Sequence, residues 1–261
     1  RTPNPCIDCN RFMKFDRLYE RAKILGCDHV ATGHYARIEE RDGKFVLKKA
    51  LDPAKDQSYV LYTMTQEQLA HTLFPLGGYS KPEARKLAED GGLVNAEKPD
   101  SQDICFAPDG DYAAAIERYT GKKPQPGNFV DADGNVLGQH KGIIHYTIGQ
   151  HRGLGLGQNE RAYVCKICPA DNTVVLGPSE ALFRRDAAAA DVNWISGQAP
   201  GGPIRCCAKV RYRQTEQPCE VTVEEDGSVQ VLFDRPQRAI TPGQAVVLYD
   251  GDTVLGGGTI L

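Results

Sequence analysis

Two polar segments of the sequence carry cysteines of a kind that proteins use as nucleophiles. Residues 4–10 (NPCIDCN) contain Cys6 and Cys9, and residues 100–106 (DSQDICF) contain Cys105. A thiol in a polar, loop-like segment is placed for reactivity rather than for packing, because the nucleophile and metal ligand is the accessible thiolate. The two segments therefore predict sulfur chemistry.

The remaining cysteines admit structural roles or metal binding. Cys6 and Cys9 form a C-x-x-C pair, and a second pair is formed by Cys165 and Cys168. Each pair is compatible with a redox couple or with half of a tetrahedral zinc site. Because the pairs fall in different predicted domains, packing is favoured for the second pair and no metal site is predicted. Structural positions are also expected for Cys27, Cys206, Cys207 and Cys219.

The elements around the first thiol segment predict an α/β unit. Apolar residues at three- and four-residue steps over 15–25 indicate a helix that ends at Gly26. Residues 29–32 then predict a short buried strand of a parallel sheet. Residues just past the carboxyl end of such a strand face the ligand crevice, and here these are Gly33 and His34. A plain strand-end turn is the alternative at this position.

Local signals continue the α/β pattern to about residue 119. An Asp-Gly turn at 42–43 predicts a hairpin. Thr65 with Gln68, and Ser80 with Glu83, have the spacing of capping boxes and predict two helices.

Composition changes twice along the rest of the chain. The Gly- and Pro-rich residues 121–127 predict a linker, after which short strands and turns replace helices, with only 179–190 expected to be helical or irregular. A second such stretch at 196–203 precedes five predicted strands, which suggest a small barrel. The predicted domains are 1–120, 121–200 and 201–261.

Overall composition sets outer limits. The chain has 261 residues, of which 41% are hydrophobic and 25% charged, enough for a sizeable core in two or three domains. A net charge of -3 argues against nonspecific polyanion binding by the whole surface but permits local basic patches. Nine cysteines without regular spacing favour reduced thiols. With no apolar run of membrane-spanning length and no signal pattern, a cytoplasmic protein without a membrane partner is expected.

One candidate basic patch lies in the last predicted domain. Arg205, Lys209, Arg211 and Arg213 occupy alternate positions, so on a strand they would share one face. Such a run is either a solvated face or a phosphate-binding stripe on an RNA-binding barrel.

Seven separated motifs carry a family resemblance. They are NPxxxCN at 4–10, ATGHY at 31–35, KDQSY at 55–59, DSQDICF at 100–106, YTIGQ at 146–150, RYRQ at 211–214 and TPGQ at 241–244. In order and over the whole length, they resemble the bacterial tRNA-specific 2-thiouridylases. The resemblance implies ATP-dependent transfer of sulfur to C2 of the wobble uridine (position 34) of tRNA, through an adenylated intermediate.

The resemblance also implies a fold and a missing part. It implies an α/β unit that is the C-terminal part of a PP-loop adenylating domain, followed by a small central β domain and a C-terminal β-barrel. The family's nucleotide loop, Ser-Gly-Gly-x-Asp-Ser, precedes the first thiol motif and does not occur here. Because the sequence also starts at Arg1 rather than Met, we expect a truncated fragment that is inactive alone. ATP with Mg2+ is the cofactor expected of the full-length enzyme.

Residue roles follow from the resemblance. Cys105 matches the cysteine that carries the persulfide, and Cys9 matches its partner thiol, described as the nucleophile. Many relatives have Asp at the position of Cys6, so the part of Cys6 in the exchange stays open. Gly33 matches a nucleotide contact. The expected tRNA contacts are Asn4, Pro5, Cys6, His34, Lys55, Asp56, Gln57, Arg211, Tyr212 and Gln244.

The expected partners are tRNA and a protein that delivers persulfide sulfur to a monomeric enzyme. Two alternatives come from other classes. One is a noncatalytic RNA-binding protein whose thiols are incidental, and the other is a module stabilised by zinc. The sequence leaves open which tRNAs are modified and which donor supplies the sulfur.

Overall fold

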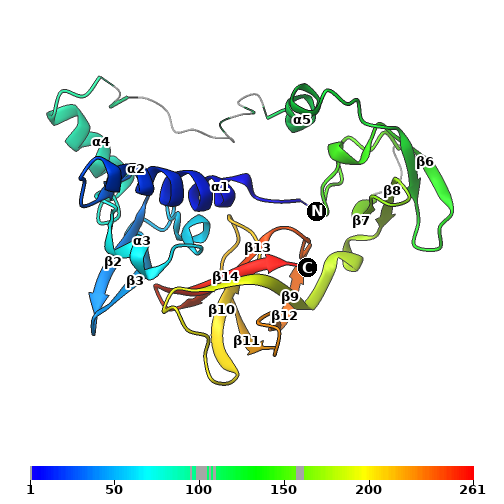
Figure 1. Cartoon of the computed structure of the whole chain (residues 1–261). Helices are drawn as coiled ribbons and strands as arrows, with labels where there is room; N and C mark the ends of the chain where they lie inside the picture. The colour runs from blue at the N-terminus through cyan, green and yellow to red at the C-terminus, as the bar shows by residue number, and fades with distance from the viewer. Residues whose placement is uncertain (1, 95, 98–104, 106, 108–109, 157–161) are drawn as a thin grey trace.

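The computed structural model describes residues 2–94, 96–97, 105, 107, 110–156 and 162–261 (Figure 1). Of the predicted segment 100–106, therefore, only Cys105 lies among the described residues.

The chain begins with one long helix. It comprises α1 (Pro5–Asp8), the π-helical segment η1 (Cys9–Arg17) and α2 (Leu18–Ile24). The expectation of a loop at 4–10 was wrong, because Asn4 caps the helix by accepting a hydrogen bond from the Cys6 amide. The proline that follows suits a first helical turn, where its missing N–H leaves no bond unmade.

The rest of the α/β unit follows its local signals. β1 (Val30–Ala31) pairs in parallel with β4 (Thr72–Leu73). β2 (Ala36–Arg41) and β3 (Lys44–Lys49) form the predicted hairpin, whose turn has positive φ at Asp42 and Gly43. The 3-10 segment η2 (Ser58–Leu61) is buried. Complete capping boxes start α3 (Gln66–Ala70) and α4 (Lys81–Asp90), which confirms both predictions.

The middle of the chain forms a separate small sheet. After α5 (Tyr112–Thr120), the strands β5 (Gly127–Val130), β6 (Val136–His140), β7 (Tyr163–Cys168) and β8 (Thr173–Gly177) pair in the order β6-β5-β8-β7. A 3-10 turn, η3 (Ile143–His145), follows β6. Phe129, Val164 and Val174 form the centre of its core and are fully buried.

The C-terminal part is a closed barrel of six strands. After the 3-10 turn η4 (Ser179–Leu182) they are β9 (Phe183–Trp194), β10 (Ile204–Lys209), β11 (Gln217–Val223), β12 (Val229–Arg238), β13 (Ala245–Asp250) and β14 (Thr253–Ile260). The order is β13-β10-β11-β12-β9-β14, and pairing of β13 with β14 closes the ring. The α/β unit, the central β domain and the C-terminal barrel confirm the predicted fold class.

The strand β9 was not predicted. Its alanine run suggested a helical or irregular segment, but Ala187 and Ala189 alternate into the barrel core with no exposed surface. Pairing with β12 on one side and β14 on the other decides the conformation against local propensity. The barrel therefore starts before residue 201, where the last predicted domain began.

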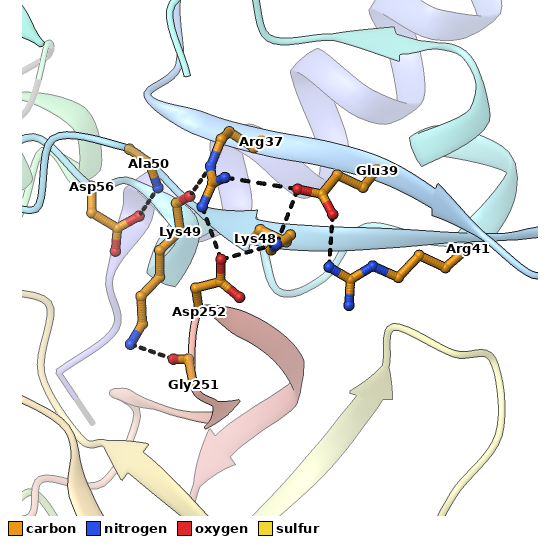
Figure 2. Close-up of polar contacts among 9 residues, drawn as sticks. All are labelled: Arg37, Glu39, Arg41, Lys48, Lys49, Ala50, Asp56, Gly251 and Asp252. Atoms are coloured by element: carbon orange, nitrogen blue, oxygen red, sulfur yellow. Dashed lines mark hydrogen bonds and ion pairs between the residues drawn. The ribbon is translucent and has the colours of Figure 1, made fainter. Parts of the chain in front are cut away.

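The barrel is joined to the α/β unit through the β2–β3 hairpin. β14 pairs with β3 at Thr253 and Lys48, so the hairpin continues the barrel sheet. Figure 2 shows Lys48 between two carboxylates, with Nζ 3.0 Å from Glu39 Oε1 and 2.9 Å from Asp252 Oδ2. Arg37 also pairs with Asp252, at 2.9 Å. These ion pairs fix the barrel beside the hairpin (Figure 1). No helix of the described residues has the length and apolar character to cross a membrane.

Candidate functional site

Three thiols share one electrostatic environment at the start of the N-terminal helix. Cys6 and Cys9 are three residues apart on that helix, so they lie on the same face. Cys6 and Cys105 are exposed and Cys9 is half-buried. Partial burial raises the pKa of the Cys6 thiol, Cys9 and Cys105 raise it further, and Lys14 opposes them. Cys6 is therefore within electrostatic range of both thiols predicted to be catalytic.

His34 lies behind this helix as a neutral, buried imidazole. Its side chain packs against the rings of Phe15 and Phe74, with both centroids at 5.8 Å. Burial, with a smaller contribution from Lys14, lowers its pKa to about 4. The ammonium of Lys14 can only donate, so Nε2 of His34 accepts that bond, at 3.3 Å, and Nδ1–H donates to Thr32 Oγ1 at 2.7 Å. The His34 ring thus links the end of β1 to the N-terminal helix that carries Cys6 and Cys9, which we call the thiol helix.

The segments 33–35 and 55–57 lie side by side. The Tyr35 amide donates to Gln57 Oε1, and the Gln57 amide donates to the Tyr35 carbonyl, each at 2.9 Å. Gly33 precedes this contact and is the second residue after the end of β1. A Cβ at Gly33 would meet only Leu76 Cδ1, at 3.7 Å, so the backbone there is open to close approach.

Asp56 holds its own loop in shape. Oδ1 accepts from the amides of Ala50 and Ser58 at 3.1 and 3.2 Å, and Oδ2 accepts from the Ser58 hydroxyl at 2.9 Å (the Ala50 bond is drawn in Figure 2). Only 6% of its side chain is exposed, and Lys209 Nζ of the barrel lies 3.8 Å away. The carboxylate of Asp56 is thus turned into its own loop, whereas Lys55 and Gln57 on either side of it are half-buried.

A group of charges fixes the barrel against this loop. Lys49 forms an ion pair with Glu216 and donates to the Gly251 carbonyl at 2.8 Å, and Lys209 lies 3.7 Å from Glu216. Both ammonium groups lie over the buried ring of Tyr249, at 4.7 and 5.2 Å from its centroid. Burial raises the pKa of Tyr249, so this phenol stays neutral beneath the two cations.

Tyr212 brings the barrel to the thiol helix. Its ring packs edge-to-face on Tyr59 at 5.9 Å, and 38% of the residue is exposed. Burial raises the pKa of its phenol, and the negative charges of Asp56 and Cys6 raise it further. The structure therefore gathers Tyr212, the loop of Asp56 and the thiol helix at one place.

Unlike Tyr212, which packs on the α/β unit, Arg211 points toward the central domain. Its Nη2 donates to the carbonyls of Ile148 and Ala239 at 3.0 and 2.9 Å and to Thr241 Oγ1 at 3.1 Å. Burial lowers the pKa of the guanidinium, with a further contribution from Arg238. Arg211 thus ties the YTIGQ segment of the central domain to the barrel.

The helix start is itself held by the barrel. Thr2 donates to the Pro242 carbonyl at 2.9 Å, and Gln244 Nε2 donates to the Thr2 carbonyl at 2.5 Å. Asn4 Oδ1 accepts from the Cys6 amide at 3.1 Å, and Pro5 occupies the first turn. Asn4 and Gln244 therefore position the thiol helix through bonds that sequence alone did not indicate.

The predicted stripe of four basic residues does not exist as one face. β10 ends at Lys209, and Arg205 forms a bidentate pair with Asp234 at 2.9 and 2.7 Å. A cleft of about 440 Å³ lies instead beyond the strand, and it combines three guanidinium groups with apolar side chains. Its lining is Phe183, Arg211, Arg213, Gln214, Pro236, Gln237 and Arg238. Arg238, which packs on Tyr163 at 5.2 Å, was missed because it belongs to none of the recognised motifs.

The second C-x-x-C pair lies elsewhere, on β7 of the central sheet. Cys165 Sγ donates to the Tyr163 carbonyl at 3.4 Å, and burial raises its pKa. The described residues hold no group of three or more side chains suited to a metal ion.

Comparisons with known proteins cover the whole chain. Three family models match consecutive regions: the tRNA methyl transferase HUP domain over 1–109, the tRNA methyl transferase PRC-barrel domain over 114–178, and the aminomethyltransferase beta-barrel domain over 184–260. The tRNA-specific 2-thiouridylases MnmA of Clostridioides difficile and Acetivibrio thermocellus are 49% and 50% identical over 100% of this chain and 73% of theirs. The relative of the same name from Geotalea uraniireducens is 51% identical over 100% and 69%, respectively.

Proposed function

Because the chain belongs to the family of tRNA-specific 2-thiouridylases, we propose that it is a tRNA-uridine 2-sulfurtransferase that forms 2-thiouridine at the wobble position. The observation that supports this most is the environment of Cys6, whose thiol is influenced by Cys9 and Cys105 and itself influences Tyr212. A site for sulfur transfer to a base needs two thiols and a surface that receives the base, and these features meet here.

In this proposal the sulfur follows a path of two displacements. Cys105 carries a persulfide whose terminal sulfur attacks C2 of the uracil and displaces the activated C2 oxygen. The thiolate of Cys9 then attacks Sγ of Cys105. The bond from Sγ to the transferred sulfur breaks, and its electron pair remains on that sulfur as the C2 thiocarbonyl forms. The resulting Cys9–Cys105 disulfide is reopened by a thiol reductant.

The C2 oxygen is a poor leaving group, and ATP with Mg2+ would supply its activation by adenylation. Of this chain's residues, Gly33 offers an open backbone to a nucleotide. The phosphate-binding pattern Ser-Gly-Gly-x-Asp-Ser does not occur in the sequence. The residues present could therefore contact a nucleotide at Gly33 but do not supply that loop. We therefore assign no step of the reaction to groups around the phosphates.

The target base is proposed to enter between the thiol helix and the barrel. A wobble uridine in a single-stranded anticodon loop is cheap to unstack, and the exposed ring of Tyr212 is suited to stacking. Lys55 and Gln57 would contact the base or the tRNA backbone. His34 would contribute indirectly, by holding the thiol helix in position. We propose that the chain works as a monomer in a reducing, cytoplasmic setting and takes its sulfur from a carrier protein.

Persulfide mapping tests the sulfur path without ATP. The chain is incubated with a persulfide-carrying protein donor, alkylated, digested and mapped by mass spectrometry. One additional sulfur is expected on Cys105 in the unaltered chain and in Cys27→Ser, which removes another exposed thiol, and none in Cys105→Ser. Equal labelling of Cys27 and Cys105 would contradict the proposal.

Thiolation of tRNA tests the reaction as a whole. The prediction that the chain alone forms no thiouridine is checked by mass spectrometry of tRNA nucleosides, beside a chimera that adds the nucleotide-loop segment of a relative. The chimera is expected to thiolate tRNA. Unchanged thiolation by the chimera with Cys105→Ser would favour the alternative, a noncatalytic RNA-binding protein whose thiols are incidental.

A further inference from the structure

A second pair of thiols faces the interior of the barrel. Cys206 on β10 and Cys219 on β11 are direct cross-strand partners, and their Sγ atoms are 3.7 Å apart. Cys219 is part of the barrel core and Cys206 packs against it. The neighbouring Cys207 points to the opposite face of β10, because side chains alternate along a strand. The pairing is therefore specific to two of the three thiols.

The two thiols differ in access and in ionisation. Cys219 has no exposed surface, whereas Cys206 is half-buried. The hydrogen bond between the two Sγ atoms lowers the pKa of Cys206 against the effect of burial, and Arg205 lowers it further. The same bond, together with burial, raises the pKa of Cys219. The accessible sulfur is thus the one that more readily becomes a thiolate.

We propose that Cys206 and Cys219 are a redox-active dithiol site, oxidised to an internal disulfide by low-molecular-weight disulfides. The Cys206 thiolate attacks one sulfur of the reagent, RSSR, forming a mixed disulfide and releasing one thiolate RS⁻. Cys219 loses its proton and attacks Sγ of Cys206, which expels the second RS⁻. Two protein thiols are oxidised, and one RSSR is reduced to two RSH. This site was expected to be merely structural from the sequence.

The position of the pair gives its oxidation a consequence. The disulfide would link the two strands in the middle of the β10–β11 ladder and close a ring that spans residues 206–219. That segment includes Arg211 and Tyr212, which contact the central domain and the α/β unit, respectively. Oxidation would restrict the hairpin in the unfolded chain and stabilise its folded geometry. The inference does not depend on the proposed sulfur transfer.

Disulfide mapping of the full chain tests the proposal. The reduced protein is incubated with glutathione disulfide, its free thiols are alkylated, and it is digested with trypsin, which cuts between the two cysteines. We expect a linked peptide joining residues 206–209 to the peptide that contains Cys219, and its loss on reduction. Because Cys206 and Cys207 share a peptide, Cys207→Ser serves as the matched control and is expected to keep the link.

Two variants separate the outcomes. Cys206→Ser changes a half-buried thiol and is expected to abolish the link, and Cys219→Ala removes the buried partner without adding a polar group. Oxidation should also raise Tm of the unaltered chain by about 5 °C, and leave Tm of Cys206→Ser unchanged. The proposal is overturned if glutathione remains on Cys206 of the folded chain without an internal link, or if the link joins Cys207.

Discussion

The thiols of the helix and those of the barrel belong to the same residue type but sit in opposite surroundings. Cys6, Cys9 and Cys105 are exposed or half-buried near charged groups. Cys206 and Cys219 face an apolar core and have each other as partners. We propose that the helix thiols exchange sulfur with a protein partner and that the barrel pair reacts with low-molecular-weight disulfides. Position in the fold, rather than sequence spacing, separates the two kinds of chemistry.

The largest expected effect comes from removing a helix thiol. In the chimera that carries a relative's nucleotide-loop segment, Cys9→Ser is expected to lower thiouridine formation on the order of 10³-fold or more, because a nucleophile is lost. Cys206→Ser in the same protein is expected to change it less than about twofold. Rates are measured from the thiouridine content of tRNA over time. Comparable losses in both variants would erase the distinction between the two sets of thiols.

A pH effect is expected from the region of the thiol helix. The pKa of His34 is lowered from 6.5 to about 4 in the folded state, so the unfolded chain binds more protons between these values. The stabilisation is therefore complete above about pH 6.5 and falls as pH drops toward 4, by about 3 kcal/mol in total. Urea unfolding followed at several pH values measures this slope. His34→Gln should flatten the slope, while His151→Gln, at an exposed position, should retain it.

A smaller effect is expected where the barrel meets the central domain. Arg211→Ala removes the hydrogen bonds to Ile148, Ala239 and Thr241 and should lower the free energy of unfolding by about 1–3 kcal/mol. Arg213→Ala, beside it and exposed, is the matched control and should leave stability unchanged. Denaturant titration measures both. If Arg213→Ala were the more destabilising variant, Arg211 would not be the residue that joins the domains.

The smallest effect concerns the reactivity of the barrel pair. Arg205 helps to lower the pKa of Cys206, but it is exposed and already paired with Asp234. Arg205→Ala is expected to slow the oxidation of Cys206 by roughly twofold to threefold at low salt, and less at high salt. The rate is read from the appearance of the linked peptide. A faster reaction in the variant would contradict this electrostatic account.

Features controlled by neighbours in sequence were predictable. The capping boxes at Thr65 and Ser80 and the Asp-Gly turn gave the helices and the hairpin correctly, because their hydrogen bonds close within a few residues. The strand β9 was not predictable from its alanine run, because its conformation depends on pairing with β12 and β14, which are distant in sequence. The helix start was missed because the polar residues and cysteines of 4–10 suggested a loop.

The motifs named candidate site residues, but they did not indicate the contacts of those residues. The motifs identified Asp56, Arg211 and Gln244, yet their side chains are bonded to the protein's own backbone. The pair Cys206–Cys219 was overlooked because nothing in the spacing of the two residues indicates cross-strand register. Such contacts depend on tertiary packing, which the motifs do not encode.

The central claim is that Cys9 and Cys105 act together at one site. It is tested most directly by mapping disulfides in the Cys6→Ser chain after donation of persulfide sulfur and removal of the donor, with no thiol or reductant added, so that attack of Cys9 on Sγ of Cys105 expels hydrosulfide and leaves the disulfide. The account predicts a peptide linking Cys9 to Cys105 that disappears in Cys9→Ser and persists in Cys27→Ser. A Cys105 that keeps its persulfide, with Cys9 remaining fully alkylated, would contradict it.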